Sequence, residues 1–173
     1  MRRLIMAATA AIIVMAPATA RADAFSGLWL TENGKAVVEL KPCANSICGN
    51  IHWLRADAKQ YDYQNPEEAA RRTPLCGMRI LWGFEADGLT AWEDGTIYKA
   101  DDGDTYHAEM EILEDGNLHL RGYVGIPMLG KSQIWTRAKA ADYKRCDGPT
   151  GAFDESLSRG GHSTQQPKGR VND

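Results

Sequence analysis

The sequence predicts an all-β fold, an antiparallel up-and-down β-barrel of eight to nine strands. Short runs rich in β-branched and aromatic residues recur along the chain. Turn sequences separate most of these runs, and no segment with helical periodicity is long enough to form a crossover helix between two strands. Strands joined without crossover helices pair antiparallel with their neighbours in sequence, which favours a meander closed into a barrel.

The first 20 residues predict a secretory signal peptide that is cleaved from the mature chain. Arg2 and Arg3 precede an apolar stretch at 4–15, and small residues at 18–20 form a cleavage pattern. The residues at 22–24 offer a second cleavage pattern. Because the apolar stretch is shorter than the roughly 20 residues of a membrane span, we expect cleavage rather than anchoring. The predicted location is therefore periplasmic or secreted, and no later segment is apolar enough to be transmembrane.

Nine short runs in the exported chain have strand-like composition or alternate apolar and polar residues. Gly-containing turn sequences, such as Asp94-Gly95, separate most of them. The predicted strands are 27–32, 35–41, 47–54, 77–84, 89–93, 96–100, 105–113, 117–124 and 132–138.

The register of one hairpin follows from its turn, Glu114-Asp115-Gly116. A two-residue loop at Asp115-Gly116 would mix charged and apolar side chains on each face of the hairpin. A three-residue loop with a left-handed Gly116 pairs Leu113 with Asn117 and separates the two kinds of side chain, so we predict this register. Its apolar face carries Tyr106, Ala108, Met110 and Ile112 opposite Val124, Gly122, Leu120 and Leu118.

The same alternation assigns an inner face to two further strands. In one strand it places Met78, Ile80, Trp82 and Phe84 on the inner face, and in another it places Ile47, Gly49, Ile51 and Trp53 there. An eight-stranded barrel encloses either packed side chains or one small ligand, and the sequence leaves both open. The candidate ligand-binding residues of a hollow barrel are Trp53, Met78, Trp82, Phe84, Tyr106 and Met110.

Four cysteines lie in the exported part of the chain, where an oxidising compartment favours disulfides. Cys43 and Cys48 flank a turn between two predicted strands, so a hairpin would bring them within bridging distance. That pairing leaves Cys76 with Cys146. No metal site is predicted, because the cysteines and histidines lack the ligand spacing of zinc sites.

The remaining segments define the domain organisation. We expect one barrel domain at 21–146, interrupted by a long connection at 55–76 that serves as a binding loop or covers one barrel end. Within this connection, Asn65-Pro66 predicts the start of a short helix. The segment 147–173 is rich in glycine, serine and other polar residues, which predicts a disordered tail.

Charge and motif content exclude several functions. The formal net charge of −3 becomes −5 once Arg2 and Arg3 leave with the signal peptide, so the chain lacks the basic footprint of a nucleic-acid-binding protein. It has no phosphate-binding glycine loop and no serine elbow. We therefore predict no catalytic residues and no cofactor, and we expect the protein not to be an enzyme.

Residues at both ends of the predicted barrel resemble those of the lipocalin-like (calycin) arrangement. In that arrangement a tryptophan in a Gly-x-Trp sequence, here Gly27 and Trp29, closes the barrel base. An arginine of the last strand, here Arg137 in Trp135-Thr136-Arg137, packs over the tryptophan ring. The resemblance implies a lipocalin-like barrel in which these residues have a structural role.

The stretch from about 27 to 137 also resembles a bacterial family, domain of unknown function 2147. The matching segments include "GLW", "CANSICGNIHWL", "RRTPLCG", "DGTIY" and "LHLRGYVGIPMLGKSQIWTR". The chain departs from the family pattern at "YKADDGDTY", which lacks the usual Asp-Pro after the tyrosine. The family has no established activity, so the resemblance implies no catalytic residues.

Two functions follow as hypotheses. The first is an exported protein that binds a small apolar or amphipathic ligand in the barrel, whose aromatic inner face would provide the wall. The second is a non-enzymatic envelope interaction module with a solid barrel core, whose long connection or outer face engages a protein.

Overall fold

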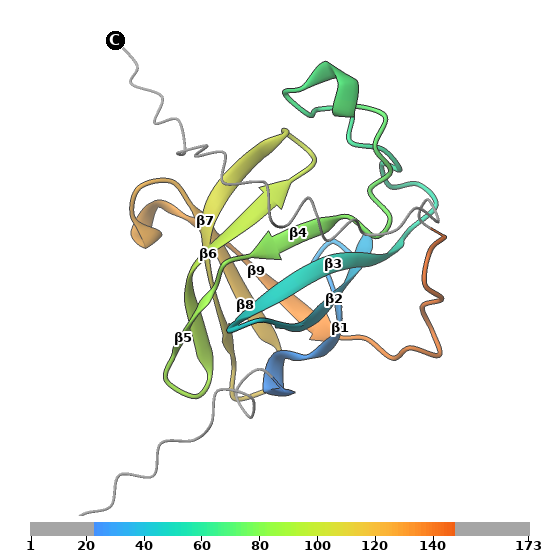
Figure 1. Ribbon diagram of the computed structural model, residues 1–173. Helices are drawn as coiled ribbons and strands as arrows, with labels where there is room; N and C mark the ends of the chain where they lie inside the picture. The colour runs from blue at the N-terminus through green and yellow to red at the C-terminus, as the bar shows by residue number, and fades with distance from the viewer. Residues whose placement is uncertain (1–22, 148–173) are drawn as a thin grey trace, which may run out of the picture.

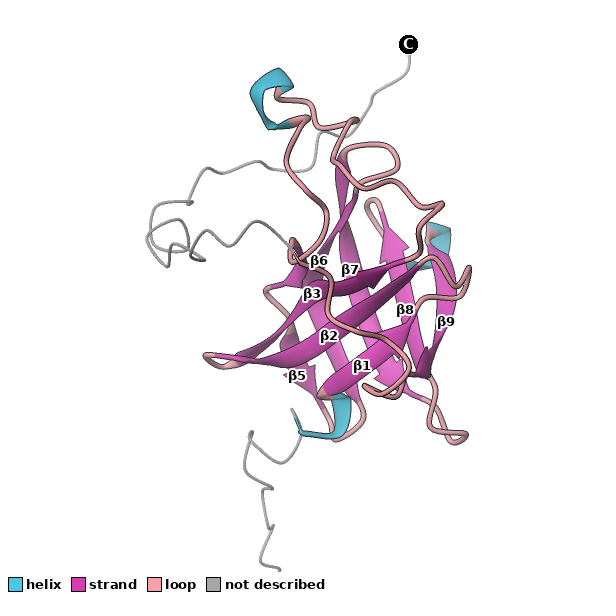
Figure 2. Ribbon diagram, turned by 90° about the vertical axis from the view of Figure 1, so that its right-hand side faces the viewer, coloured by secondary structure: helices cyan, strands magenta, loops and turns pink. Residues whose placement is uncertain are grey.

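The computed structural model describes residues 23–147. The predicted signal peptide at 1–20 lies outside the described residues, and so does the predicted tail from residue 148 onwards. The described chain folds into one antiparallel sheet with the strand order β4-β3-β2-β1-β9-β8-β7-β6-β5, closed by pairing of β4 with β6 (Figure 1 and Figure 2). Eight strands thus form a closed barrel and β5 is an additional strand, which confirms the predicted fold class. The strands are β1 (Gly27–Leu30), β2 (Ala36–Cys43), β3 (Ser46–Leu54), β4 (Arg79–Trp82), β5 (Glu85–Asp87), β6 (Ala91–Lys99), β7 (Asp104–Ile112), β8 (Leu118–Tyr123) and β9 (Lys131–Arg137).

The connections between strands gather at two ends of the barrel. One end, called the loop end below, carries the β1–β2, β3–β4, β6–β7 and β8–β9 connections; the opposite end, called the base, lies where the described chain begins (Figure 1). The β3–β4 connection contains a 3-10 turn, η1 (Glu68–Ala70), where the short helix was predicted, and the β8–β9 connection contains η2 (Pro127–Leu129). No helix in residues 23–147 is long and apolar enough to cross a membrane.

The β7–β8 hairpin has the predicted register. Met110 pairs with Leu120 and Glu109 with Arg121, and the Leu113 amide donates to the Asn117 carbonyl at 2.9 Å. Gly116 has a φ of 81°, the left-handed conformation that the three-residue loop requires.

A different hairpin shows where the alternation argument is wrong. Val37 pairs with Trp53 and Val38 with Ile51, so His52 is an extra residue in β3. Val38 belongs to the buried core, and the partner of its neighbour Val37 must therefore face outward. Trp53 accordingly lies on the outer face, where its ring centroid is 5.0 Å from that of Tyr143.

A second irregularity corrects the expected orientation of β4. Gly49 pairs with Leu81 but Asn50 pairs with Arg79, which leaves Ile80 as the extra residue. Leu81 is fully buried in the core, so Trp82, the next residue along the strand, faces outward and pairs with Thr96. Gly83 has a φ of 77°, and this left-handed conformation interrupts the regular alternation of inward and outward side chains. Phe84 consequently returns to the interior and is buried.

The predicted turn at Asp94-Gly95 is instead a bulge within one long strand, β6. Trp92 pairs with Met110 and Gly95 with Ala108, so two residues of β6 lie opposite Glu109 alone. A side chain at position 95 is excluded, because a Cβ there would lie 2.2 Å from the Phe84 ring. The glycine was therefore a packing requirement rather than a turn signal.

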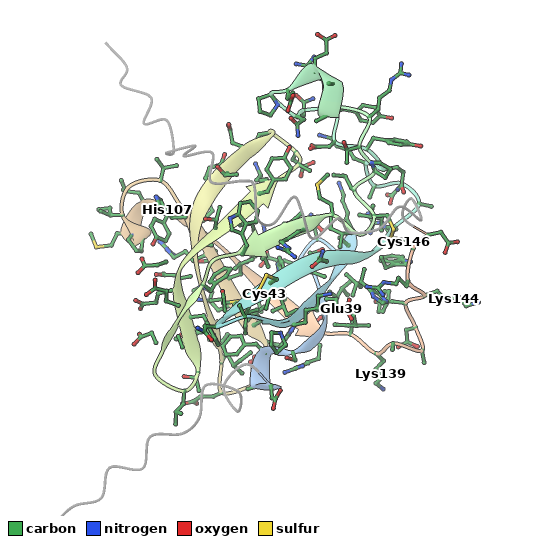
Figure 3. All side chains as sticks on the ribbon, viewed as in Figure 1. Glu39, Cys43, His107, Lys139, Lys144 and Cys146 are labelled. Carbon is green, nitrogen blue, oxygen red and sulfur yellow. A yellow bond between two sulfur atoms is a disulfide. The ribbon has the colours of Figure 1, made fainter. Side chains whose placement is uncertain are left out.

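Both predicted disulfides are present. Cys43 bonds to Cys48 across the β2–β3 turn, and Cys76 bonds to Cys146 over a sequence separation of 70 residues. The second disulfide fixes the chain after β9 against the outer face of β2 and β3 (Figure 3). Two further contacts attach this segment to the sheet. The Cys146 amide donates to the His52 carbonyl at 2.8 Å, and Arg145 forms an ion pair with Glu39 at 2.9 Å.

Candidate functional site

The base of the barrel is closed by residues from both ends of the described chain. The Arg137 guanidinium lies 4.0 Å from the centroid of the Trp29 ring, which is fully buried. Arg137 also donates to the carbonyls of Ser26, at 2.7 Å, and Ala24. Gly27 has a φ of 124°, and a Cβ there would lie 3.1 Å from the Arg137 guanidinium. These contacts place the Arg137 side chain across the base, between Trp29 and the segment that precedes β1.

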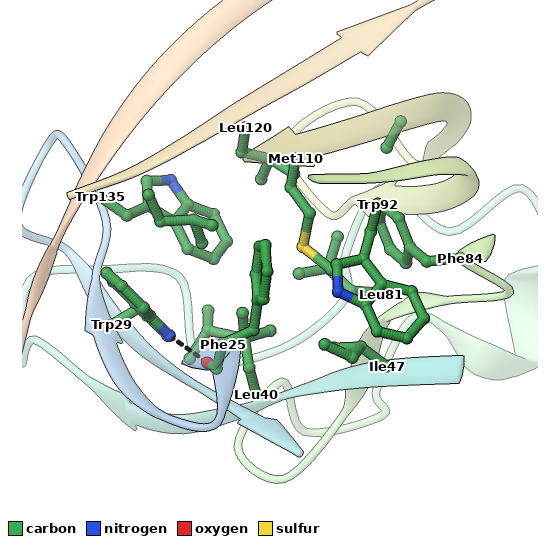
Figure 4. Close-up of a cluster of buried hydrophobic side chains, with 13 residues drawn as sticks. Phe25, Trp29, Leu40, Ile47, Leu81, Phe84, Trp92, Met110, Leu120 and Trp135 are labelled. Atoms are coloured by element: carbon green, nitrogen blue, oxygen red, sulfur yellow. Dashed lines mark hydrogen bonds between the residues drawn. The ribbon is translucent and has the colours of Figure 1, made fainter. Parts of the chain in front are cut away.

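Phe25 contributes to the closure from inside the barrel. Its ring is fully buried and meets the ring of Trp92 edge to face, with centroids 6.3 Å apart. Its carbonyl accepts a hydrogen bond from Trp29 Nε1 at 2.8 Å (Figure 4). No sequence pattern indicates this role, because Phe25 stands alone beside the predicted cleavage region. The core to which it belongs comprises Phe25, Trp29, Val38, Leu40, Ile47, Leu81, Phe84, Trp92, Ala108, Met110, Leu118, Leu120 and Trp135.

The six predicted ligand-binding residues do not line one common cavity. Phe84 and Met110 lie in the packed core. Trp53 and Trp82 face outward, as described above, and Met78 is half-buried where the chain enters β4. Tyr106 is half-buried on the inner face towards the loop end, where it pairs with Ile97.

Tyr106 belongs to a polar group at the loop end. Its hydroxyl donates to the Asp102 carboxylate at 3.0 Å, and Lys99 also bonds to Asp102. Burial, followed by the hydrogen bond to Asp102, raises the pKa of the Tyr106 phenol. Asp102 thus joins Lys99 and Tyr106 in one hydrogen-bonded group at the β6–β7 turn.

The long β3–β4 connection is attached to the barrel by a buried carboxylate, Asp62. The Tyr98 hydroxyl lies 2.7 Å from each Asp62 oxygen, and Asn65 Nδ2 donates to Asp62 at 2.7 Å. Burial, followed by the hydrogen bond to Asp62 and the charge of Asp62, raises the pKa of the Tyr98 phenol. The connection also passes so close to the β6–β7 turn that a Cβ at Gly103 would lie 1.9 Å from the Gln64 carbonyl oxygen. This attachment makes the connection a fixed part of the loop end.

The β8–β9 connection presents large apolar side chains to solvent. Met128 is 82% exposed and Leu129 is 77% exposed, while Val124 and Ile126 are about half exposed. Arg121 fixes the backbone beneath them by donating to the carbonyls of Pro127 and Met128. We refer to residues 124–129 as the apolar loop. The sequence showed these apolar residues, but only the structure shows that they are uncovered in the described chain.

The outer face of β5 to β8 is acidic. A depression of about 230 Å³ on this face is lined by the side chains of Asp87, Glu93, Glu109 and Glu111, and by His119, which pairs with Glu111. A hydrogen bond with Asp87, together with the charge of Asp87, raises the pKa of Glu93. No group of His, Cys, Asp and Glu side chains within residues 23–147 is arranged to hold a metal ion. The carboxylates therefore give this face a negative potential and no recognisable metal centre.

Comparisons with known proteins agree with this architecture. The family model described as "Uncharacterized protein conserved in bacteria (DUF2147)" matches residues 27–137. A solved structure, protein HP1028 from Helicobacter pylori, is described as belonging to the lipocalin family and aligns with a TM-score of 0.63. The alignment covers 70% of this chain and 91% of that chain at 21% identity, which shows a shared fold alone. The search of curated proteins found no match.

Proposed function

Because this chain belongs to the bacterial family described as DUF2147 and has a lipocalin-like barrel, we propose that it is an exported, non-enzymatic interaction protein that binds its partner on the outside of a packed barrel. The observation that carries the proposal is the filled interior. Phe25, Trp92 and Met110 meet in the middle of the barrel, each exposed by 2% or less (Figure 4). A ligand of drug-like size needs a cavity of a few hundred Å³, and these side chains occupy the space where it would lie.

The outer surface supports the same proposal. Monomeric proteins seldom leave several large apolar side chains together in water, and such patches mark interaction sites. The apolar loop groups four of them within six residues of sequence, at 124–129.

Export is the part of the proposal that rests on sequence and disulfides together. The first 20 residues have the composition of a signal peptide, and disulfides persist in oxidising compartments. All the cysteines of the chain are paired in the two disulfides. These features support a periplasmic or secreted location.

Binding of a small apolar or amphipathic ligand inside the barrel is the second candidate. It is favoured by Tyr106 and Ile97, which are half-buried on the inner face towards the loop end. A ligand there would occupy only the part of the barrel above the packed core, or would require Phe25 to move.

A titration with an environment-sensitive apolar dye tests the choice between the two. The packed barrel predicts no saturable one-site binding to the interior, and native mass spectrometry of protein purified from its own envelope should show no bound small molecule. Saturable binding that Met110→Trp abolishes, with Met128→Trp as the matched surface control, would contradict the proposal and establish the ligand carrier.

A further inference from the structure

The backbone of the apolar loop is fixed by hydrogen bonds from Arg121 and Gly130. Arg121 Nε donates to the Pro127 carbonyl, and its terminal nitrogens donate to the Met128 carbonyl and to Ser132 Oγ at 2.8 Å. The Gly130 amide closes the 3-10 turn by donating to the Pro127 carbonyl at 2.9 Å. These bonds fix the backbone of the apolar loop, on which the side chains of Met128 and Leu129 are 82% and 77% exposed.

The surface next to the apolar loop is negatively charged. Arg121 pairs in register with Glu109 on the outer face, and Glu93 and Asp94 form the bulge opposite Glu109. In the described part of the chain, none of these three carboxylates forms an ion pair at hydrogen-bond distance, and the nearby Arg121 guanidinium directs its hydrogen bonds to the loop and to Ser132. The three carboxylates outnumber the one guanidinium beside them, so a partner that brings cations to this face would meet a net negative charge.

The loop and the acidic face are joined through Tyr123. Tyr123 ends β8, is 9% exposed and packs its ring against His107, with centroids 5.6 Å apart. A Cβ at Gly130 would lie 2.9 Å from the Tyr123 Cβ, so the end of the loop lies directly on this residue. Figure 3 shows His107 beside the same loop. Tyr123 thus lies between the apolar loop and the strands that carry the carboxylates.

We propose that the apolar loop and the neighbouring carboxylates of Glu93, Asp94 and Glu109 form a docking surface for a basic amphipathic segment of another exported protein. The inference deepens the proposed function and rests on it. Apolar side chains of the segment would cover Met128 and Leu129, while its lysines or arginines would approach the carboxylates. An anionic bilayer is a poorer fit, because the carboxylates would repel it. A second copy of the chain is also a poorer fit, because its own acidic face would repel this one.

Fluorescence anisotropy with a labelled helical peptide of leucine and lysine provides the test, and the corresponding leucine–glutamate peptide is the charge control. We expect saturable binding of the lysine peptide alone. The double variant Met128→Ser/Leu129→Ser should weaken it by at least about tenfold, a change of about 1.4 kcal/mol. Glu93→Gln/Glu109→Gln should weaken it and flatten its dependence on salt. Tyr63→Ser, an exposed aromatic position on the β3–β4 connection, is the matched control and should leave binding unchanged.

The outcomes separate this inference from the proposed function. Equal binding of both peptides, no saturation, or a loss caused by Tyr63→Ser would overturn the docking surface. Co-sedimentation with phosphatidylglycerol vesicles that the Met128→Ser/Leu129→Ser variant loses would replace the protein partner with a bilayer. Self-association lost in the same variant would replace it with a second copy. Failure of the proposed function has a different signature, which is dye binding inside the barrel that Met110→Trp removes.

Discussion

The Tyr98 hydroxyl donates to the fully buried carboxylate of Asp62 across 36 residues of sequence, at 2.7 Å. This contact attaches the β3–β4 connection to β6, and the ion pair of Lys59 with Asp101 at 3.3 Å attaches it to the β6–β7 turn. A buried carboxylate is costly unless hydrogen bonds satisfy it, and here Tyr98 and Asn65 supply them. The connection is therefore attached at this point by a buried polar pair, in addition to the burial of Leu75 and the Cys76–Cys146 disulfide near its other end.

Replacing Tyr98 by phenylalanine should destabilise the protein by about 1–3 kcal/mol, because the Asp62 carboxylate then loses a donor without gaining water. Urea unfolding followed by tryptophan fluorescence measures the change in the free energy of unfolding. Asp62→Asn with Tyr98→Phe in a double-mutant cycle should show strong coupling. Two independent, additive losses would contradict a direct contact.

The same pair predicts a dependence on alkaline pH. The folded protein raises the pKa of Tyr98 above its ordinary value near 10. At a pH above this ordinary value of 10, the unfolded chain loses the phenolic proton while the folded chain keeps it. The free energy of unfolding must therefore fall as pH rises. Measured from pH 8 upwards, this fall should be shallower in Tyr98→Phe than in the wild-type protein. Parallel curves for the two proteins would argue that Tyr98 titrates normally.

The sequence predicted those features that local chemistry determines. The β7–β8 register followed from a glycine-containing turn, and the disulfide of Cys43 with Cys48 followed from a hairpin. The outward orientations of Trp53 and Trp82 could not be predicted in this way. The extra residues His52 and Ile80 shift the alternation of inward and outward side chains, and nothing in the composition indicates such a shift.

The long-range contacts were also beyond the reach of sequence patterns. Asp62 and Tyr98 are ordinary residues in their own segments, and only the closed barrel brings them together. Phe25 similarly has no periodic partner and reaches the core through the path of the chain before β1. Residues that meet through topology rather than through local spacing need a structure to be found.

The closure of the base predicts which of the two cleavage patterns is used. Cleavage after Ala24 would remove the carbonyl that accepts from Arg137 and would place a new ammonium beside that guanidinium. Cleavage after Ala20 keeps the contact. Intact-mass measurement of the exported protein should therefore show a chain that begins at Arg21, with all four cysteines oxidised. A chain beginning at Phe25 would show that the Ala24 contact is dispensable.

The stacking of Arg137 on Trp29 should be measurable as a coupling energy. Trp29→Ala and Arg137→Ala each remove the same contact, so their effects on stability should be non-additive by about 0.5–2 kcal/mol. Arg137→Lys keeps the charge but loses the planar group that lies 4.0 Å from the ring centroid, and it should recover little of the loss. A coupling energy indistinguishable from zero would remove the barrel-closing role of this pair.

The packing of the interior is tested by one substitution at two methionines. Met110 is 2% exposed and lies in the core, whereas Met128 is 82% exposed on the apolar loop. Met110→Trp should cost about 1–3 kcal/mol, because a filled core accepts additional volume only by shifting its neighbours. Met128→Trp should change stability by no more than about 0.5 kcal/mol, since its side chain remains in solvent. Denaturant midpoints at constant slope compare the two variants directly. If both are neutral, the barrel has room beside Met110, and binding of a small ligand inside it becomes the better account of the protein.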